Sequence, residues 1–339
     1  MLRIRRSSRL NSPFILRPAP RNSLWGGVRL KNDYGKDFET TPIAETWECS
    51  THPHGLSTVV TGRFKRRTLK SVLWWNPRFR GTNLKGLKRG EIPILIKFID
   101  ARDNLSVQVH PSDEYAKVFE NGSLGKTEMW YVAHAAKNAS LVYGFNQDVT
   151  PSIVKDALNK GKLDKYLNKV DIEDNQVYFV EAGTIHGIGA GALIVEVQES
   201  SDLTYRLYDY NRTDKQGNKR ELHVDKALAV MNMKKMDPPR QPIRILRYSP
   251  GMAFETLVRC KYFEVERLLI NTSNTKKLPK FKTKATSFEV LVCYSGCGSI
   301  TYGRYHSSVN FFKGDTIFIP ANSVEMKIHG NAELLKIHC

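Results

Sequence analysis

The chain has 339 residues, 41% of them hydrophobic, and it carries a formal net charge of +18. A chain of this length and apolar content can bury a substantial core and divide into two domains, which excludes a wholly disordered protein. No run of 18 apolar residues occurs, so the sequence predicts no membrane-spanning helix.

The first ten residues, MLRIRRSSRL, contain four arginines and no acidic residue. Transit peptides have a similar composition, but the segment lacks the apolar core of a secretory signal. We interpret residues 1–12 as a disordered basic tail or an over-long start. The five cysteines are odd in number and form no CxxC pair, which favours a reducing, cytoplasmic setting.

Basic residues gather in three runs, RFKRRTLK (63–70), RFRGTNLKGLKR (78–89) and TKKLPKFKTK (275–284). A positive field attracts phosphates without specific contacts, so a nucleic-acid binder is one hypothesis. None of the runs forms an RNP-like strand or a helix-turn-helix pattern, and a solvated basic surface explains them. We therefore expect no nucleic-acid partner, although a small anionic substrate would use the same field.

Short apolar, β-branched or aromatic runs recur along the chain between Gly, Asn, Asp and Ser residues. They predict strands at 92–100, 105–110, 128–135, 140–145, 176–183, 192–199, 289–296 and 316–322. Helical patterns are few: residues 111–120, a segment that begins at Thr150 and Pro151, and residues 223–231. The pattern predicts a mainly all-β sandwich or barrel with a few decorating helices.

A proline-rich segment separates two stretches that are rich in strands. KMDPPRQPIRILRYSPG, residues 235–251, contains four prolines and a glycine. Such composition is typical of a domain boundary. We expect one domain over residues 13–245 and a second over residues 246–339.

One predicted strand has a polar face. In DNLSVQVHPSDE, residues 103–114, the polar Ser106, Gln108 and His110 alternate with aliphatic residues, and Pro111 follows. Because side chains of a strand alternate between its two faces, the three polar groups point to one side and the aliphatic groups to the core. The polar side therefore indicates a functional interior.

Other predicted strands add to this polar set. Lys126 and Glu128 share a face in GKTEMWYVAHA, Glu196 and Gln198 share one in LIVEVQES, His186 lies in a glycine-rich turn, and Arg206 follows downstream. If these strands are neighbours, one glutamine, one glutamate and two histidines could converge. Nitrogen and oxygen ligands of this kind suit zinc or a similar divalent ion.

Each of these residues taken alone would be explained as a satisfied core or surface residue, so the hypothesis depends on their combination. Glutamine is also an uncommon zinc ligand. His52 and His54 in THPHG resemble a metal pair, but Pro53 separates them in a loop, and we interpret them as loop residues near the mouth of the site.

Several spaced motifs occur in one order: WGG (25–27), AETWECSTHPHG (44–55), PILIKFIDARDNLSVQVHPSDEYA (93–116), GKTEMWYV (125–132), AGTIHGIGAG (182–191) and VQESSDLTYRLYDYNR (197–212). Together they resemble the type I mannose-6-phosphate isomerases of the short bacterial form, from about residue 13 onward. The resemblance implies a zinc-dependent aldose–ketose isomerase with one Zn²⁺ per chain, built of two cupin or jelly-roll β-barrel domains.

The resemblance also implies roles for individual residues. The family's metal ligands fall on Gln108, His110, Glu128 and His186, and its active-site arginine falls on Arg206. Other residues implicated in binding or proton transfer correspond to Lys97, Ser106, Lys126 and Glu196. The chain departs from longer members because it lacks their helical insertion, and because Gly187 and Ile188 follow His186 where those members carry an aromatic residue.

Moving a carbonyl between two carbons requires a proton shuttle and stabilisation of an enediolate. Zinc and Arg206 would stabilise the developing negative charge. Either Lys126 or Glu196 could be the base, and the sequence does not choose between them. Ser106 and Lys97 would hold the phosphate through charge-assisted hydrogen bonds.

The C-terminal segment repeats part of the pattern. Residues 313–328 align with residues 174–188 as strand, turn and strand, and Glu325 then falls where His186 stands. We expect a second cupin-like domain without a metal site and with a structural role.

Two functions remain open besides nucleic-acid binding: the isomerase, and a metal-loaded cupin that binds a sugar phosphate without converting it. In both cases the expected partner is a small sugar phosphate. We predict no nucleic acid, no membrane and no obligate protein partner.

Overall fold

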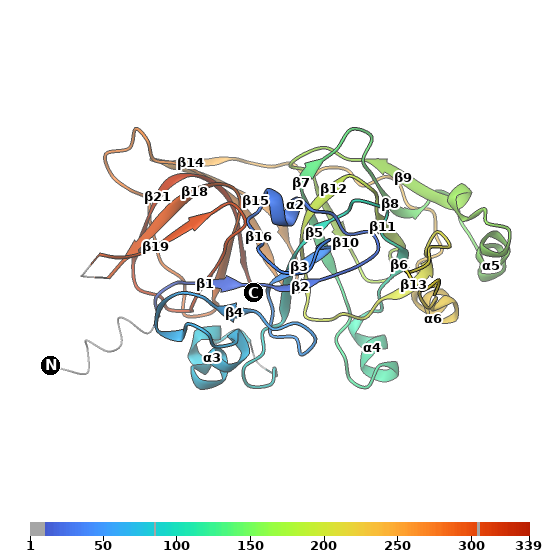
Figure 1. Cartoon of the computed structure of the whole chain (residues 1–339), viewed down its shortest axis with the longest axis horizontal. Coiled ribbons are helices and arrows are strands. Elements are labelled where there is room, and N and C mark those ends of the chain that lie inside the picture. The colour runs from blue at the N-terminus through green and yellow to red at the C-terminus, as the bar shows by residue number, and fades with distance from the viewer. Residues whose placement is uncertain (1–10, 85, 304–305) are drawn as a thin grey trace.

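The structure, a computed structural model, describes residues 11–84, 86–303 and 306–339. It is mostly β, as the sequence predicted, and its strands form three sheets. In Figure 1 the C-terminal strands, in orange and red, lie on the left, and the green and yellow middle of the chain lies on the right. The basic tail predicted for residues 1–12 lies, up to residue 10, outside the described residues.

Two of the three sheets contain most of the residues that the sequence predicted for the site. The six-stranded sheet has the order β10-β7-β12-β5-β3-β2, and the five-stranded sheet has the order β13-β6-β11-β8-β9. The strands of the six-stranded sheet are β2 (Ala19–Arg21), β3 (Glu45–Cys49), β5 (Ile94–Asp100), β7 (Glu128–Ala135), β10 (Val177–Val180) and β12 (Ala192–Glu199). Those of the five-stranded sheet are β6 (Val107–Val109), β8 (Ser140–Phe145), β9 (Leu167–Asp171), β11 (His186–Ile188) and β13 (Tyr205–Tyr208).

The six-stranded sheet lies between two cores. Every residue of β5 is buried. Ile94, Ile96 and Phe98 join a core shared with the C-terminal strands, whereas Ile99 joins a core with residues of β8 and β11. Because alternate side chains point to opposite faces, the face of β5 that carries Lys97 and Ile99 is turned toward the five-stranded sheet.

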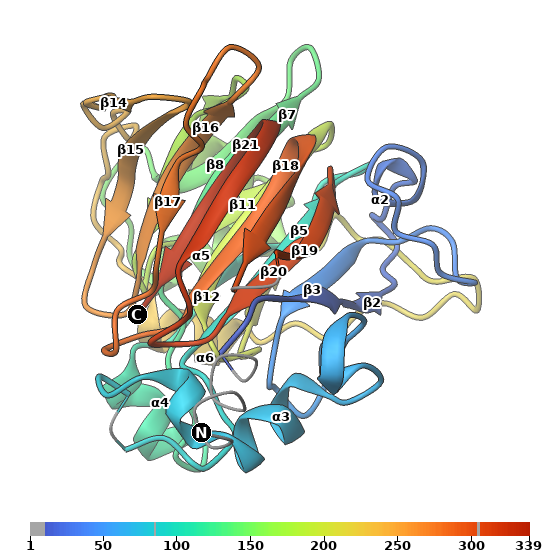
Figure 2. The same cartoon turned by 90° about the vertical axis from the view of Figure 1, so that its left-hand side faces the viewer.

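The third sheet has ten strands in the order β14-β15-β16-β21-β18-β20-β1-β4, with β17 on β21 and β19 on β18. Figure 2 faces this sheet, with β21 and β18 in front. Its strands are β1 (Phe14–Arg17), β4 (Thr58–Val59), β14 (Arg247–Ser249), β15 (Met252–Arg259), β16 (Glu264–Asn271), β17 (Lys280–Phe281), β18 (Glu289–Tyr302), β19 (Ser307–Phe312), β20 (Thr316–Ile319) and β21 (Met326–His338).

This sheet takes strands from both ends of the chain. In β1, Phe14 lies opposite Phe318 of β20, and β4 pairs with the other edge of β1. Residues before the predicted boundary at 245 therefore complete a sheet formed mainly after it. Among the described strands, none of the three sheets closes on itself.

The three helices that the sequence predicted are confirmed. They are α4 (Asp113–Phe119), α5 (Pro151–Asn159) and α6 (Val224–Val230). Ser112 and Thr150 cap α4 and α5 by accepting a hydrogen bond from the backbone of Tyr115 and Ile153. The other helical elements are α2 (Arg29–Asn32), α3 (Leu69–Trp75) and the 3₁₀ turns η1 (Gly62–Phe64), η2 (Pro77–Arg80) and η3 (Leu163–Tyr166). None of the helices among the described residues has the length and apolar content to cross a membrane.

A buried ion pair joins the six-stranded sheet to the ten-stranded one. Glu48 of β3 is fully buried, and Lys36 Nζ lies 2.8 Å from its carboxylate. The hydroxyls of Thr46 and Thr316 donate to the same carboxylate at 2.7 and 2.9 Å. Because Thr316 belongs to β20, this cluster fixes the two sheets against each other.

Candidate metal centre and active site

The candidate residues lie in two rows on facing sheets. On the five-stranded sheet, Gln108 of β6 lies opposite Arg206 of β13 and opposite His186 of β11. On the six-stranded sheet, Glu196 of β12 lies opposite Trp130 of β7 and opposite Lys97 of β5. Directly opposite residues on neighbouring strands share a face, so each row presents a continuous set of polar side chains.

Three of the expected ligands form one buried group. The ligand atoms of His110, Glu128 and His186 all lie within 4.8 Å of one another. Glu128 Oε2 is 3.5 Å from His110 Nε2, and Glu128 Oε1 is 3.5 Å from His186 Nε2. The amide nitrogen of Gln108 is 3.4 Å from His186 Nε2, and its amide oxygen accepts a hydrogen bond from Ser106. The structure therefore brings together the four residues that the resemblance implies as ligands.

The hydrogen bonds around the two histidines direct their Nε2 atoms at this group. His110 Nδ1 contacts the carbonyl of Leu203 at 2.8 Å, and His186 Nδ1 contacts the carbonyl of Thr184 at 2.8 Å. A carbonyl can only accept, so each Nδ1 carries the proton and each Nε2 keeps its lone pair. Burial, together with Lys126, lowers the pKa of His186 to about 4, and the same causes hold the pKa of His110 well below its ordinary value. Both imidazoles are thus neutral at physiological pH, as metal ligation requires.

The carboxylate between the histidines is under-coordinated. Glu128 Oε1 is buried and has no hydrogen-bond partner among the described residues, whereas Oε2 faces Lys126. Lys126 Nζ lies 2.8 Å from Oε2 as an ion pair. A buried carboxylate oxygen without a partner is costly, and Lys126 reaches only one of the two oxygens of this carboxylate. The donor set therefore fits a divalent metal ion with nitrogen and oxygen preference.

A chain of charged side chains runs from the group of His110, Glu128 and His186 to Lys97. Lys126 Nζ lies 3.1 Å from His110 Nε2 and 3.9 Å from Glu196 Oε1. Glu196 Oε1 pairs with Lys97 Nζ at 2.8 Å, and its Oε2 accepts a hydrogen bond from the Trp130 indole at 3.0 Å. Burial opposes ionisation of Glu196, but Lys126 and Lys97 outweigh it and lower its pKa. Glu196 is thus held as an anion.

Arg206 and Ser106 flank the same group. Arg206 donates from Nη1 to the Glu221 carbonyl at 2.7 Å, and its buried Nε has no hydrogen-bond partner among the described residues. Ser106 Oγ donates to Gln108 Oε1 at 3.2 Å. Lys97 is only 6% exposed and pairs with Glu196, and it also lies 3.7 Å from Glu45. The sequence predicted that Lys97 binds the substrate phosphate, but in the structure Lys97 is an internal member of the chain of charged side chains. Its phosphate role stays a prediction.

The loop histidines lie beside this region. Asp202 contacts His54 Nδ1 at 2.5 Å and His52 Nε2 at 3.6 Å. The His52 ring packs edge-on against Trp47, and Lys97 lies over the same indole. Asp202 precedes the residue whose carbonyl receives the His110 hydrogen bond. The loop thus borders the site through an aromatic side chain.

Sequence reasoning did not identify three residues of this neighbourhood. Trp130 donates to Glu196 and packs edge-on against His186, Glu45 contacts Lys97, and Asp202 holds the loop histidines. All three types are common in strands and loops, and only the pairing of distant strands brings them here. One signal was available, since Trp130 stands two residues after Glu128 and therefore shares its face.

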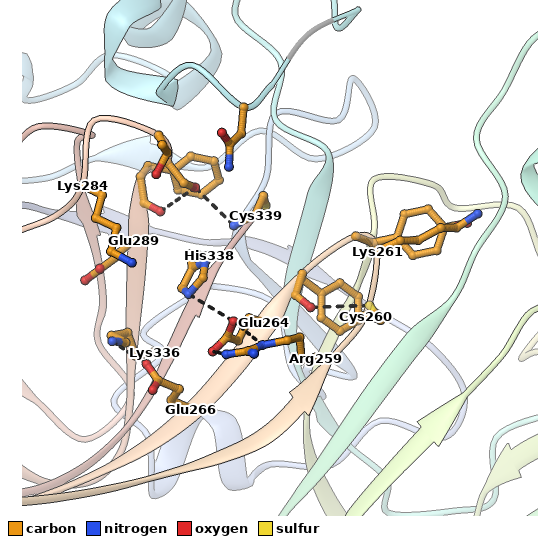
Figure 3. A pocket seen from close by; sticks show the side chains of 16 residues that line it. Arg259, Cys260, Lys261, Glu264, Glu266, Lys284, Glu289, Lys336, His338 and Cys339 are labelled. Carbon is orange, nitrogen blue, oxygen red and sulfur yellow. Dashed lines mark hydrogen bonds and ion pairs between the residues drawn. The ribbon is translucent and has the colours of Figure 1, made fainter.

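The described residues contain two further groups of possible ligands: the loop group of His52, His54 and Asp202, and a group in the C-terminal part. Glu264, Glu266 and His338 line a cavity of about 560 Å³, drawn in Figure 3. Arg259 binds Glu264 through two hydrogen bonds at 2.8 and 2.9 Å, and Lys336 pairs with Glu266. Two built-in cations neutralise two carboxylates here, and the three residues are only half-buried, so the group is an ion-pair network. His110, Glu128 and His186 are instead fully buried, and Glu128 Oε1 has no partner among the described residues. Glu325, which aligns with His186, is exposed and pairs with Lys280 at 2.8 Å.

Comparisons with known proteins agree with this geometry. The family model for the catalytic domain of type I phosphomannose isomerase matches residues 14–126, and that for the cupin domain of mannose-6-phosphate isomerase matches residues 253–339. The chain is 35% identical to mannose-6-phosphate isomerase ManA of Bacillus subtilis, over 96% of this chain and 98% of that protein. It is 33% identical to mannose-6-phosphate isomerase of Streptococcus mutans, over 96% and 98% of the two chains. The crystal structure of mannose 6-phosphate isomerase from B. subtilis superimposes with a TM-score of 0.86 at 32% identity, over 97% of this chain and 100% of that chain.

Proposed function

The chain belongs to the type I mannose-6-phosphate isomerase family, and from this premise we propose that it is a zinc-dependent enzyme that interconverts mannose 6-phosphate and fructose 6-phosphate. Each of its two parts would be a cupin jelly roll, with the division between residues 245 and 246. The catalytic part would hold the metal and the substrate. The C-terminal part would support it.

One observation carries this proposal: Glu128 Oε1 is buried without a hydrogen-bond partner among the described residues, and the carboxylate lies between two histidines whose Nε2 atoms are each 3.5 Å from it. We infer that His110, Glu128, His186 and Gln108 hold one zinc ion. An amide binds a metal through its oxygen, so Gln108 would turn its amide over to do so, since its nitrogen is the atom that faces His186. When bound, zinc would act as a Lewis acid that stabilises negative charge on the sugar oxygens.

The reaction moves one proton between neighbouring carbons. A base removes the proton from carbon 2 of mannose 6-phosphate, and the released electron pair forms the carbon 1–carbon 2 double bond of an enediolate. The proton then returns to carbon 1, the carbonyl forms at carbon 2, and the hydroxyl proton of oxygen 2 passes to oxygen 1. The unpartnered Nε of Arg206 is suited to donate to the oxygen on which negative charge develops.

Between the two candidate bases, Lys126 is the better one. A general base works best when its pKa is near the working pH. The pKa of Glu196 is lowered because Lys126 and Lys97 overcome the effect of burial, and Lys97 and Trp130 already occupy its oxygens. Lys126 Nζ lies within 3.1 Å of His110 Nε2, beside the inferred metal. We assign proton transfer to Lys126, and we assign to Glu196 the role of orienting the Lys126 side chain.

The phosphate would be held at the other end of the substrate. We assign substrate binding to Ser106, which contacts the inferred ligand Gln108, and to Lys97, which pairs with Glu196 and could offer a charge-assisted contact. The partner is then a small sugar phosphate.

Isomerase activity of protein stripped with a chelator and reloaded with zinc tests the proposal. We expect fructose 6-phosphate to form from mannose 6-phosphate only in the reloaded protein, and one zinc to bind per chain. Binding of zinc without turnover of mannose 6-phosphate would refute the assigned reaction, and full activity of the stripped protein would refute the metal dependence.

A further inference from the structure

The residues that carry the proposed chemistry begin in a segment without regular structure. Gly125, Lys126 and Thr127 lie between α4 and β7, in neither a helix nor a strand, and Glu128 is the first residue of β7. Lys126 and Glu128 are nevertheless almost fully buried, at 3% and 0% exposure. Interactions from outside the segment must therefore fix its backbone.

Three consecutive backbone N–H groups of this segment are tied down. Gly125 N donates to Asp113 Oδ1 at 2.9 Å, Lys126 N donates to the carbonyl of Pro111 at 3.1 Å, and Thr127 N donates to Glu199 Oε1 at 2.8 Å. A Cβ atom at Gly125 would lie 2.4 Å from the backbone nitrogen of Asp113, so only glycine permits this approach. The segment is thus clamped by two carboxylates and a carbonyl.

One of these carboxylates is held from the ten-stranded sheet. Tyr262, in the turn between β15 and β16, donates its hydroxyl to Asp113 Oδ2 at 2.8 Å. Lys261 Nζ lies 3.9 Å from the same carboxylate, and Figure 3 shows Lys261 pointing away from the cluster around Glu264 and His338. Burial and the neighbouring Asp113 raise the pKa of Glu199 to about 8, which agrees with the two carboxyl groups lying side by side.

We propose that Tyr262 is a positioning residue for the catalytic centre, because its hydroxyl orients Asp113, which in turn fixes the backbone that carries Lys126 and Glu128. This inference rests on the proposed function for its catalytic consequence. It gives the C-terminal part a direct role in the geometry of the site, beyond covering an apolar face. A tyrosine that only packed would need no hydroxyl at this place.

The test uses the full-length protein with Tyr262→Phe, which removes the hydroxyl and keeps the ring. Tyr248→Phe, at an exposed tyrosine of β14, is the matched control. Because a hydrogen bond to a charged group is at stake, we expect kcat to fall about tenfold with KM unchanged within about twofold, and the zinc dissociation constant to rise several-fold. The control should match the wild type in all three quantities.

The positioning role also predicts that Tyr262 and Asp113 act together. Asp113→Ala should lower kcat, and adding Tyr262→Phe to it should cause little further loss, because the Tyr262 hydroxyl has no Asp113 side chain left to orient. Circular dichroism establishes that every variant is folded at the assay temperature. If Tyr262→Phe keeps wild-type kcat and wild-type zinc affinity, or if the two losses multiply, the positioning role is wrong. The zinc measurement does not depend on turnover, so it decides the inference even if the wild type does not isomerise mannose 6-phosphate.

Discussion

The buried pair of Lys36 and Glu48 offers a quantitative test of how the two parts of the chain are joined. Lys36 is 6% exposed and Glu48 is 0% exposed, and Thr316 of the ten-stranded sheet donates to the same carboxylate. Glu48→Gln keeps the shape of the side chain but removes its charge. Lys36 then remains buried without its counter-charge.

Removing one partner of a buried ion pair costs about 3–5 kcal/mol. The entropy of unfolding is about 2.1 cal/mol/K per residue, or roughly 0.7 kcal/mol/K for a chain of 339 residues. The midpoint of thermal unfolding should therefore fall by about 4–7 °C. Replacing both partners, as Lys36→Met with Glu48→Gln, should recover much of this loss because no unpaired charge is left.

Thermal unfolding followed by circular dichroism, with zinc in excess, measures the effect. Glu325→Gln is the control, because this glutamate forms an ion pair with Lys280 at the surface and its loss should leave the midpoint unchanged. The reasoning would be refuted if Glu48→Gln unfolded at the wild-type temperature, or if the double variant were less stable than Glu48→Gln alone.

Four further predictions concern residues in the site and beside it. Arg206→Ala should lower kcat by about 10²–10³-fold, as for loss of an oxyanion donor, with zinc content unchanged, which metal analysis and steady-state kinetics would establish. His110→Ala should abolish stoichiometric zinc binding, and retention of one zinc per chain would contradict its assignment as a ligand. Lys126→Met should remove turnover more completely than Glu196→Gln in the same assay, and the reverse order would make Glu196 the base. Folding raises the pKa of Glu199 to about 8 from an ordinary value of 4.5. Between these two pH values the folded protein keeps a proton on Glu199 that the unfolded chain has lost. The stability that this proton contributes is therefore lost as pH rises from 4.5 to 8. Urea unfolding of Glu199→Gln should therefore show a smaller loss of stability over that range than the wild type, and equal slopes would contradict it.

The sequence predicted what depends on local patterns. Thr150 and Pro151 mark the start of α5, because a side-chain cap and a proline in the first turn act within four residues. Helix α3 was missed because its segment, with Lys65, Arg66 and Arg67 just before it, was interpreted as a basic run. Its buried Leu69, Val72 and Leu73 nevertheless follow helical spacing.

The candidate site could be predicted only in part. Alternation identified the polar face of Gln108 and His110, but β6 is limited to Val107–Val109 and does not extend over the whole predicted strand. The roles of Trp130, Asp202 and Tyr262 depend on which strands and turns meet, and single-residue patterns contain no information on such long-range pairing. The family resemblance predicted the set of ligands before the structure was known. The two rows of polar side chains could be recognised only from the strand register in the structure.

The pairing of β1 with β20 has a consequence for how the protein is made. Phe14 leaves the ribosome early, but its partner strand around Phe318 follows roughly 300 residues later. At about 5–20 residues per second, β1 waits about 15–60 seconds for β20, although β4, its partner on the other edge, is made soon after β1. During translation the nascent chain therefore carries, near its beginning, an apolar strand with one unpaired edge, which is the kind of segment that chaperones recognise. Only when β20 has been synthesised can it pair with β1 and cover this edge.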